Sequence, residues 1–576
     1  MNFTRNVIIL AVAAVLTVIH TSPLQAAAPR PVWADSGMVV SAHPLASQIG
    51  LDILKSGGNA VDAAVATAFA LGVVEGYSSG IGGGSFTLLH LVDSWETIVM
   101  DAREKAPLAA REDMYVDKQT DQIIPELSVI GVLAGAVPGH LKGLSQLLDE
   151  YGTMSLGQVM EPAIALADTG FELSQTYIRV LEHHRNKLIR FPSTFDILFH
   201  ADSTLLGLGE RLIQYDLANT YRIIADEGKE AFYHDEIASK IVHAMKKEKG
   251  LITLKDLKEY STAIREPVMG TYHGFSIYSM PPPSSGGAHL IQMLNILERY
   301  DLGYLGHNSS ETIHLMAEAM KFAFADRSVF MGDPDFADIP LAGLLSKAYA
   351  DSLSNTIFRF QAAKVLSEGD PLPYSQDEET FPGGKQTTHF SVLDQWGNMV
   401  AMTATINMGF GSGYVIPGTG IFLNNEMDDF SSQPGVPNYF GLLGAEANAI
   451  TPSKRPLSSM TPTFVFYDGA PFMILGSPGG PRIITTVLQV ILNVIDHEMT
   501  IQAAVDAPRI HHQWLPDRIY LESGIPYDVI QNLILRGHKV RFGGSWSAAQ
   551  AILIDLETGL IYGGTDSRVE GGAKGY

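Results

Sequence analysis

The chain changes character abruptly between residues 361 and 386, and this break constrains the fold more than any other feature. The stretch QAAKVLSEGDPLPYSQDEETFPGGKQ is polar, rich in Pro, Gly, Asp and Glu, and has no period of two or of 3.6 residues. Such a composition is typical of a solvated linker. The residues directly after it have the composition of a strand, so Thr387 begins an ordered element at the end of a linker.

Two strands joined by a short turn are predicted after the linker. Residues 387–393 (TTHFSVL) and 399–407 (MVAMTATIN) flank a turn-like DQWGN segment. If Leu393 pairs with Met399, the same register sets Thr405 opposite Thr387. Because residues i and i+2 of a strand share a face, Thr403 lies on the same side as Thr405. The alternative is an ordinary threonine-rich strand pair, since threonine has good β-propensity.

Composition excludes several classes of function. The 576 residues are 46% hydrophobic and 18% charged, which favours a large globular core. The formal net charge of −23 makes nucleic acid and anionic membrane surfaces unfavourable partners. The chain has no cysteine, so thiolate nucleophiles, disulfides and cysteine-based metal sites are excluded.

The familiar catalytic signatures are also missing from the sequence. It contains no G-x-S-x-G elbow, no P-loop and no H-E-x-x-H motif. The histidines at 183–184 and 511–512 are sequence neighbours, whose side chains do not converge on one metal. We therefore expect no metal and no cofactor, and a nucleophile of another kind.

The first 26 residues are predicted to be a secretory signal peptide. Arg5 precedes an apolar run from Val7 to Ile19, and small residues follow at Ala26–Ala28. The run is shorter than the ~20 residues that a membrane-spanning helix needs. The sequence predicts export to the periplasm, or full secretion, without stable membrane insertion. An uncleaved anchor is the alternative.

Local patterns predict several further elements. Residues 60–74 and 311–330 have the composition and spacing of helices, and 85–92 and 97–100 those of strands. The MPPPSSGG segment at 280–287 is predicted to be a loop, because of its Pro and Gly content.

Long motifs along nearly the whole mature chain resemble those of the γ-glutamyltransferases (γ-glutamyl transpeptidases). The strand pair at 387–407 resembles the start of the small subunit of that family. The other matching motifs, in chain order, are GGNAVDAAVA (57–66), DAREKAP (101–107), ADRSVFMGDPDF (325–336), GIFLNNEMDDFS (420–431), PLSSMTPT (456–463), GSPGGPRI (476–483) and APRIHHQWLPD (507–517).

The resemblance implies an α/β fold, the four-layer αββα sandwich of N-terminal-nucleophile hydrolases. It also implies one precursor that cuts itself between Gln386 and Thr387. The large subunit, 27–386, and the small catalytic subunit, 387–576, would stay together as a heterodimer. Cutting gives Thr387 a free α-amine, whose unperturbed pKa of ~7.7–8.0 suits a general base for its own hydroxyl.

The resemblance also implies the roles of ten residues. Thr387 is the nucleophile, Thr405 orients its hydroxyl, and the backbone N–H groups of Gly479 and Gly480 form an oxyanion hole. The donor's glutamate head carries a carboxylate and an ammonium, so its site needs groups of both charges. The carboxylate binders are Arg103, Ser458 and Ser459, and the amino-group binders are Asn407, Glu426 and Asp429.

The expected donors are glutathione and other γ-glutamyl compounds, and the expected acceptors are water, amino acids or dipeptides. A cephalosporin (glutaryl) acylase or a poly-γ-glutamate-processing transpeptidase is the alternative on the same framework. An acylase for glutaryl groups has no ammonium to bind, so Glu426 and Asp429 favour the first function. One departure from the family lies in the lid-like segment 434–445, where Phe440 stands at a position that often holds a gating tyrosine and Tyr439 precedes it.

Overall fold

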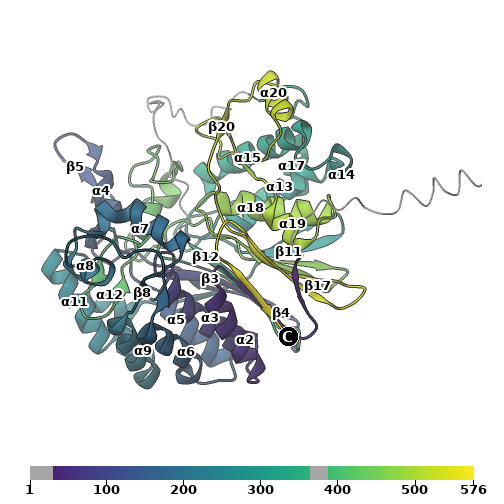
Figure 1. Cartoon of the computed structure of the whole chain (residues 1–576). Helices are drawn as coiled ribbons and strands as arrows, with labels where there is room; N and C mark the ends of the chain where they lie inside the picture. The colour runs from purple at the N-terminus through teal and green to yellow at the C-terminus, as the bar shows by residue number, and fades with distance from the viewer. Residues whose placement is uncertain (1–29, 364–386) are drawn as a thin grey trace, which may run out of the picture. The chain divides into compact units, whose positions relative to one another are not determined.

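Two seven-stranded sheets form the centre of the fold (Figure 1). The computed structural model describes residues 30–363 and 387–576. The predicted signal peptide and all but the first three residues of the predicted linker lie outside these residues. Residues 31–576 form one compact unit. In the described part of the chain, no helix has the length and hydropathy needed to cross a membrane.

The first sheet is antiparallel throughout. Its strands, in spatial order, are β1 (Val32–Ala34), β22 (Ile561–Thr565), β21 (Gln550–Ile554), β17 (Ala470–Gly476), β16 (Thr463–Tyr467), β11 (Phe275–Ser279) and β10 (Val268–Tyr272).

The second sheet is also antiparallel, and it contains the predicted strand pair at its centre. Its strands, in spatial order, are β23 (Gly572–Gly575), β2 (Met38–Ser41), β12 (Thr388–Leu393), β13 (Met399–Thr405), β3 (Gly84–Leu91), β4 (Glu96–Ala102) and β9 (Ala263–Arg265).

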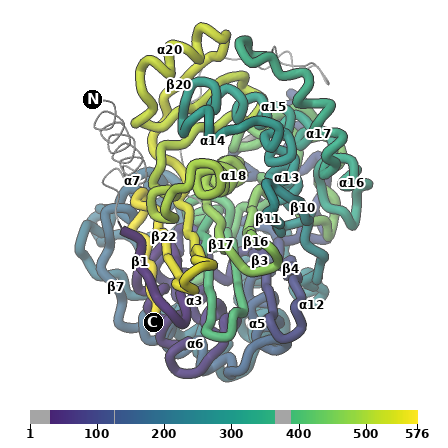
Figure 2. The backbone as a smooth tube through the Cα atoms, turned by 90° about the vertical axis from the view of Figure 1, so that its right-hand side faces the viewer, coloured from purple at the N-terminus to yellow at the C-terminus, as the bar shows by residue number. Residues whose placement is uncertain are grey.

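The two sheets pack face to face, since β12 contacts β17 and β21 while β2 contacts β22. Helices cover both outer faces. Over the second sheet lie α2 (Pro44–Lys55), α3 (Ala60–Val74) and α5 (His140–Tyr151), with α6 (Leu156–Thr169) and α9 (Tyr215–Glu227) behind them. Over the first lie α13 (Gly286–Leu297), α18 (Arg482–Ile495) and α19 (Ile501–Asp506), with α15 (Ser310–Phe330) packed on α13. Figure 2 shows α18 and α13 in front of these strands. The predicted four-layer αββα sandwich is confirmed.

Residues of β13 alternate between two hydrophobic cores. Val400 and Met402 point to the helices of the second sheet, whereas Met399 and Ala401 point to the space between the sheets. Because both faces are covered, every residue of the strand is buried. Thr405 has the parity of the inner face, so its hydroxyl lies between the sheets, at the end of the strand.

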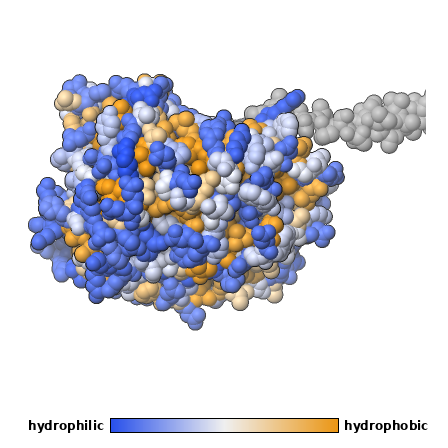
Figure 3. All heavy atoms as spheres, turned by 90° about the horizontal axis from the view of Figure 1, so that it is seen from below, coloured by the Kyte–Doolittle hydropathy of each residue, from blue (hydrophilic) through white to orange (hydrophobic). Residues whose placement is uncertain are grey.

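Helix α3 has the predicted bounds, 60–74, and all fifteen of its residues are buried. A capping box between Asn59 and Asp62 fixes its start. A helix that is apolar on every side is a core helix, and α3 indeed packs between β12, β13 and the surrounding helices. Figure 3 shows the molecule from below. This surface is mostly hydrophilic with scattered apolar patches, which is typical of a solvated protein surface.

The other predicted elements agree with the structure to within one or two residues, apart from 280–287. That segment is a loop only up to Ser285, because α13 begins at Gly286. A Cβ at Gly286 would lie 2.1 Å from the Thr461 Oγ1, and one at Gly287 would lie 2.4 Å from the Met280 carbonyl oxygen. These glycines therefore mark a close approach at the start of a helix.

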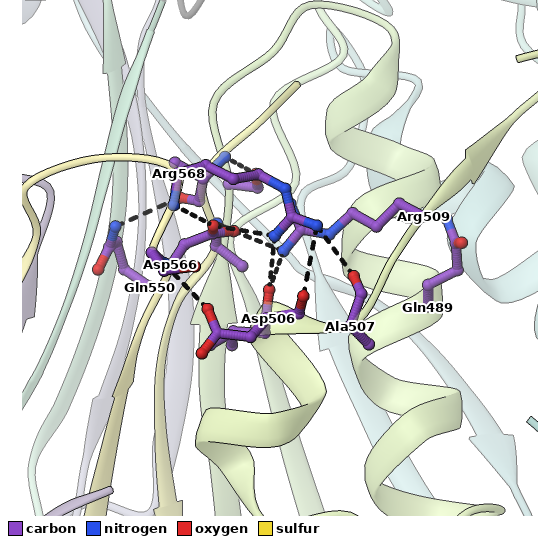
Figure 4. A network of polar contacts seen from close by, with 12 residues as sticks. Gln489, Asp506, Ala507, Arg509, Gln550, Asp566 and Arg568 are labelled. Atoms are coloured by element: carbon purple, nitrogen blue, oxygen red, sulfur yellow. Dashed lines mark hydrogen bonds and ion pairs between the residues drawn. The ribbon is translucent and has the colours of Figure 1, made fainter. Parts of the chain in front are cut away.

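A buried ion-pair network ties the C-terminal strands to α19 (Figure 4). Asp566 accepts from Arg509 Nη2 at 2.5 Å and from Arg568 Nη1 at 3.0 Å. Arg568 also donates to the carbonyl oxygens of Val505 and Ala507. Because these partners come from segments far apart in the sequence, the network fixes how the last strands join the sheets.

Candidate active site

The two threonines predicted to face each other do so. Strand β12 pairs with β13 so that Leu393 lies opposite Met399 and His389 opposite Thr403, the predicted register. Thr387 precedes β12 and is only 7% exposed. Its Oγ1 lies 3.2 Å from the Oγ1 of Thr405, which also accepts a 2.8 Å hydrogen bond from the backbone N–H of Asn407. Two hydroxyls are thus held in contact at the open end of the hairpin.

Gly479 and Gly480 lie between the end of β17 and the first turn of α18. Their φ angles, 128° and 58°, are in the region that favours glycine. A Cβ at Gly479 would lie 2.3 Å from the Ser547 Oγ. Among the described residues, neither glycine N–H donates to a backbone carbonyl. Free N–H groups at the start of a fourteen-residue helix suit an anion or an oxyanion.

Arg103 is the centre of a buried charge cluster. Its side chain is 1% exposed, and it follows β4 directly. Nη1 is paired with Glu426, Nη2 donates to Asp429 Oδ2 at 2.6 Å, and Nε donates to the carbonyl oxygen of Pro456 at 3.2 Å. A third carboxylate, Glu104, lies 3.6 Å from Nη1. Each nitrogen of the guanidinium therefore has a partner in the protein, and in the described part of the chain three of its five N–H groups are committed to hydrogen bonds.

Burial shifts the protonation equilibria of this cluster. It raises the pKa of Glu104 to about 7, against the pull of the neighbouring Arg103. Burial also raises the pKa of Glu426 and of Asp429, and here too the Arg103 guanidinium opposes the shift. The three carboxyl groups share one arginine, so they form a site that would gain from an added cation such as a substrate ammonium.

Ser458 and Ser459 lie in the loop before β16, and hydrogen bonds join this loop to the 281–287 segment. Ser458 N donates to the Pro283 carbonyl oxygen at 2.9 Å, and Ser285 N donates to the Ser458 carbonyl oxygen at 2.9 Å. The Ser285 hydroxyl donates to the same carbonyl at 3.0 Å. Both serines are buried, and both border the cavity described next.

One cavity joins these parts, and we call it the Thr387 cavity. Nine of the ten residues singled out from the sequence line it, and Gly479 adjoins it through Gly480. Those nine are Arg103, Thr387, Thr405, Asn407, Glu426, Asp429, Ser458, Ser459 and Gly480. The cavity is also lined by Phe440, which the sequence analysis noted in the lid-like segment. Sequence reasoning did not single out the remaining lining residues, which are Arg327, Leu442, Leu457, Met460, Pro481 and Ile483.

Two charged residues of the site were missed, although both lie inside motifs that carried the resemblance. Glu104 follows Arg103 directly in DAREKAP, and Arg327 lies in ADRSVFMGDPDF. A charged residue in the apolar helical pattern of 311–330 was the available signal for Arg327. Its position at the cavity depends on how α15 packs, which no local pattern encodes.

Phe440 lines the Thr387 cavity beside Gly480. A Cβ on Gly480 would touch its ring at 3.0 Å, and its carbonyl oxygen accepts from Gln513 Nε2 at 3.1 Å. The preceding Tyr439 donates its backbone N–H to Asp428 at 3.1 Å. The segment 434–445 therefore presents an aromatic ring without a hydroxyl to the glycine pair.

A separate buried cluster lies outside the Thr387 cavity. Ligand atoms of His314, Glu318 and His538 lie within 4.8 Å of one another, close enough to hold a metal ion. His314 Nδ1 lies 2.7 Å from His538 Nε2, and Glu318 accepts from the Lys321 ammonium at 2.8 Å. Hydrogen bonds within the protein already satisfy these groups, and a lysine charge adjoins them.

Comparison with known proteins agrees with this geometry. The family model Gamma-glutamyltranspeptidase matches residues 46–576. The chain is 44% identical to the Glutathione hydrolase proenzyme of Escherichia coli (strain K12), over 94% of this chain and 91% of that protein. It is 42% identical to the Acylase ACY 1 proenzyme of Pseudomonas sp. (strain V22), over 89% and 88% of the two chains.

Among solved structures, the cephalosporin acylase from Bacillus halodurans superposes with a TM-score of 0.82 at 29% identity. The match covers 96% of this chain and 99% of that one. Three findings lead to the same assignment. They are the family model that matches residues 46–576, the relatives above 40% identity and the shared fold. The chain therefore belongs to the gamma-glutamyltranspeptidase family.

Proposed function

We propose that this protein is a γ-glutamyl hydrolase and acyltransferase that matures by cutting its own chain between Gln386 and Thr387. The observation that carries the proposal is the buried Thr387–Thr405 hydroxyl pair, which shares one cavity with the Arg103–Glu426–Asp429 cluster. The proenzyme names of the relatives support the maturation step. Their glutathione hydrolase names support a γ-glutamyl donor of the glutathione type.

Maturation would use the same hydroxyl as catalysis. The Thr387 Oγ attacks the Gln386 carbonyl carbon, and the peptide C–N bond breaks to give an ester and the free α-amine of Thr387, which takes up the hydroxyl proton. Water then hydrolyses the ester, which releases the Gln386 carboxylate and restores the Thr387 hydroxyl. A φ of 124° at this β-branched residue is an uncommon and strained conformation. Cutting the bond before Thr387 would release that strain.

The two products, 27–386 and 387–576, would stay associated. Strands β12 and β13, from the small subunit, lie between β2 and β3, from the large subunit. The first sheet mixes strands of both in the same way, with β11 paired to β16. Separating the chains would break two buried sheets, so the heterodimer behaves as one folded unit.

Donor turnover would follow as nucleophilic catalysis. The neutral α-amine of Thr387 takes the hydroxyl proton as Oγ attacks the γ-carbonyl carbon of the donor. The Gly479 and Gly480 N–H groups stabilise the oxyanion, a contribution of roughly 3–4 kcal/mol per donor in related chemistry. The amine leaves with a proton, and water or the amine of an amino acid or dipeptide then attacks the γ-glutamyl ester.

The charges of the site support a glutamyl head as the donor group. Glu426 and Asp429 would receive its ammonium with help from Asn407, while Arg103, Ser458 and Ser459 would receive its carboxylate. Arginine suits a planar carboxylate because its fork gives paired hydrogen bonds. A glutaryl group lacks the ammonium, so it would leave Glu104, Glu426 and Asp429 to share the Arg103 guanidinium without an added cation.

The deciding experiment is a denaturing gel of purified protein, followed by N-terminal sequencing and a donor assay. Two bands near two-thirds and one-third of the mature mass are expected, and the smaller should begin Thr-Thr-His. A γ-glutamyl anilide should be cleaved. A single full-length band with good activity would overturn the mechanism.

An acylase is the second candidate, since both the Pseudomonas acylase and the Bacillus halodurans structure resemble this chain. The test compares γ-glutamyl anilide with glutaryl anilide, which differ only in the ammonium. Faster turnover of the glutaryl compound would favour the acylase. We further propose that residues 1–26 direct export, so that the enzyme works in the periplasm. N-terminal sequencing of the large band, starting at 27 or 28, would support that step.

A further inference from the structure

Arg327 is a buried cation at the Thr387 cavity to which the proposed function gives no role. It lies near the C-terminal end of α15, is 5% exposed and lines the cavity with Thr387 and Asp429. Its Nε donates to the Ser285 Oγ at 3.0 Å. Within residues 30–363 and 387–576, its two Nη groups form no hydrogen bond and no ion pair, so four N–H donors are unused.

Arg103 and Arg327 differ in how far the protein already satisfies them. Every nitrogen of the Arg103 side chain is paired, with Glu426, Asp429 and the Pro456 carbonyl. A substrate carboxylate at Arg103 would share the guanidinium with the Glu426 and Asp429 carboxylates, whose negative charges lie beside it. In the described part of the chain, the two Nη groups of Arg327 have no hydrogen-bonded or ion-paired carboxylate, so a substrate carboxylate would not have to share them.

Burying a guanidinium without an anionic partner raises the free energy of the folded protein, so the position of Arg327 calls for an explanation. Burial lowers the pKa of Arg327 to about 10, and the nearby Asp429 charge offsets this only in part. The group nevertheless stays protonated at neutral pH. A ligand that brings a negative charge into the cavity would remove this cost.

Hydrogen bonds fix Arg327 beside the residues expected to hold the donor head. The Ser285 hydroxyl that accepts from Arg327 donates to the Ser458 carbonyl oxygen. Ser458 is thereby joined to Arg327 through a single side chain, and Ser459 is the next residue in the chain. Asp429 lines the same cavity, and it is close enough for its charge to raise the pKa of Arg327.

We propose that Arg327 binds the carboxylate of the donor's glutamyl head and makes the enzyme selective for donors that carry it. The inference rests on the proposed function and adds a residue to it. The Arg327 guanidinium would also suit the terminal carboxylate of a peptide leaving group, as in glutathione. The position beside Ser458 and Asp429 favours the head, and the choice of donors below separates the two sources.

The test compares Arg327→Met with wild type in the full-length, self-cleaved protein. The donors are γ-glutamyl anilide, whose leaving group has no carboxylate, and γ-aminobutyryl anilide, which also lacks the head carboxylate. Truncating one partner of a buried charged contact corresponds to about a 30-fold loss or more in kcat/KM. We expect that loss on γ-glutamyl anilide, less than a threefold change on γ-aminobutyryl anilide, and a matching rise in the inhibition constant of free L-glutamate.

Two controls make the result specific. Arg222→Met removes an arginine from the exposed face of α9, where it pairs with Asp168, and should change neither donor. If the methionine variant does not mature, Arg327→Lys carries the test, because it keeps the charge but loses the fork. It should show a smaller loss, at least threefold, on γ-glutamyl anilide alone.

Other outcomes overturn the inference. An equal loss on both anilides would make Arg327 a structural residue. A loss on glutathione alone, absent with the anilide and with the ethyl ester of glutathione's glycine, would assign Arg327 to the leaving group instead. A wild-type enzyme that cuts neither γ-glutamyl donor would overturn the proposed function itself, which is a different failure.

Discussion

Replacing Thr405 by valine tests the hydroxyl pair that underlies the proposed chemistry. Valine keeps the β-branched shape in a strand whose residues are all buried, so packing should change little. It removes one oxygen, which contacts Thr387 Oγ1 at 3.2 Å and accepts from Asn407 N–H at 2.8 Å. The change therefore removes the orienting contact and leaves one buried donor unsatisfied.

The loss of folding stability and the loss of catalytic rate in this variant can be estimated separately from the structure. An unsatisfied buried N–H costs about 1–3 kcal/mol. A folded unit of 546 residues unfolds with an entropy of about 1.1 kcal/mol per degree, so the melting temperature should fall by only about 1–3 °C. Losing a hydrogen bond to the nucleophile costs about 0.5–1.5 kcal/mol, and misplacing the hydroxyl adds to that. We expect self-cleavage and turnover to slow by at least about tenfold.

The assay follows the two-band pattern on a denaturing gel over time, together with kcat on γ-glutamyl anilide and a thermal melt. Thr405→Ser is the matched control, because it restores the hydroxyl without the methyl group and should recover most of the rate. Wild-type maturation and kcat in the valine variant would refute the role of this hydroxyl. So would equal losses in the valine and serine variants, which would point to packing.

Four further predictions test the nucleophile, the head site, the base and the acceptor. Thr387→Ala should leave an uncut, inactive precursor and Thr387→Ser a slower but active enzyme, and an alanine variant that still matured in cis would require another attacking group. Arg103→Ala or Asp429→Ala should weaken γ-glutamyl anilide turnover by roughly 2–5 kcal/mol while self-cleavage persists, and normal donor kinetics in both variants would refute the assigned head site. Activity should rise between about pH 6 and 9 because only the neutral Thr387 amine accepts a proton and because burial raises the pKa of Glu104 to about 7, so the acidic groups are fully charged only above neutral pH. Glycylglycine at pH 8–9 should speed anilide release and give γ-glutamyl-glycylglycine by mass spectrometry, and an acceptor without effect on rate or products would leave a hydrolase only.

The sequence by itself determined those elements whose structure depends only on residues close together in the chain. A five-residue turn leaves little freedom of register, so the pairing of 387–393 with 399–405 followed from the positions of Leu393 and Met399 alone. Helix α3 was predicted to the residue from its unbroken apolar run, which is a local pattern, and the structure adds the Asn59 cap that fixes its start. The 280–287 loop was only partly predictable, since its two glycines serve a helix start that packs against Thr461.

Only the tertiary structure decided which charges meet at the reacting threonine. Arg103 and Asp429 are more than three hundred residues apart, and their contact depends on how β4 and the 426–429 turn come together at the end of two stacked sheets. Family motifs could identify these residues as candidates, but they could not tell which guanidinium is paired with carboxylates of the protein itself. Arg103 is paired with Glu426 and Asp429, whereas the Arg327 Nη groups have no partner in the described part of the chain. The difference arises because hydrogen bonding is set by the three-dimensional positions of the acceptors and not by the order of residues along the chain.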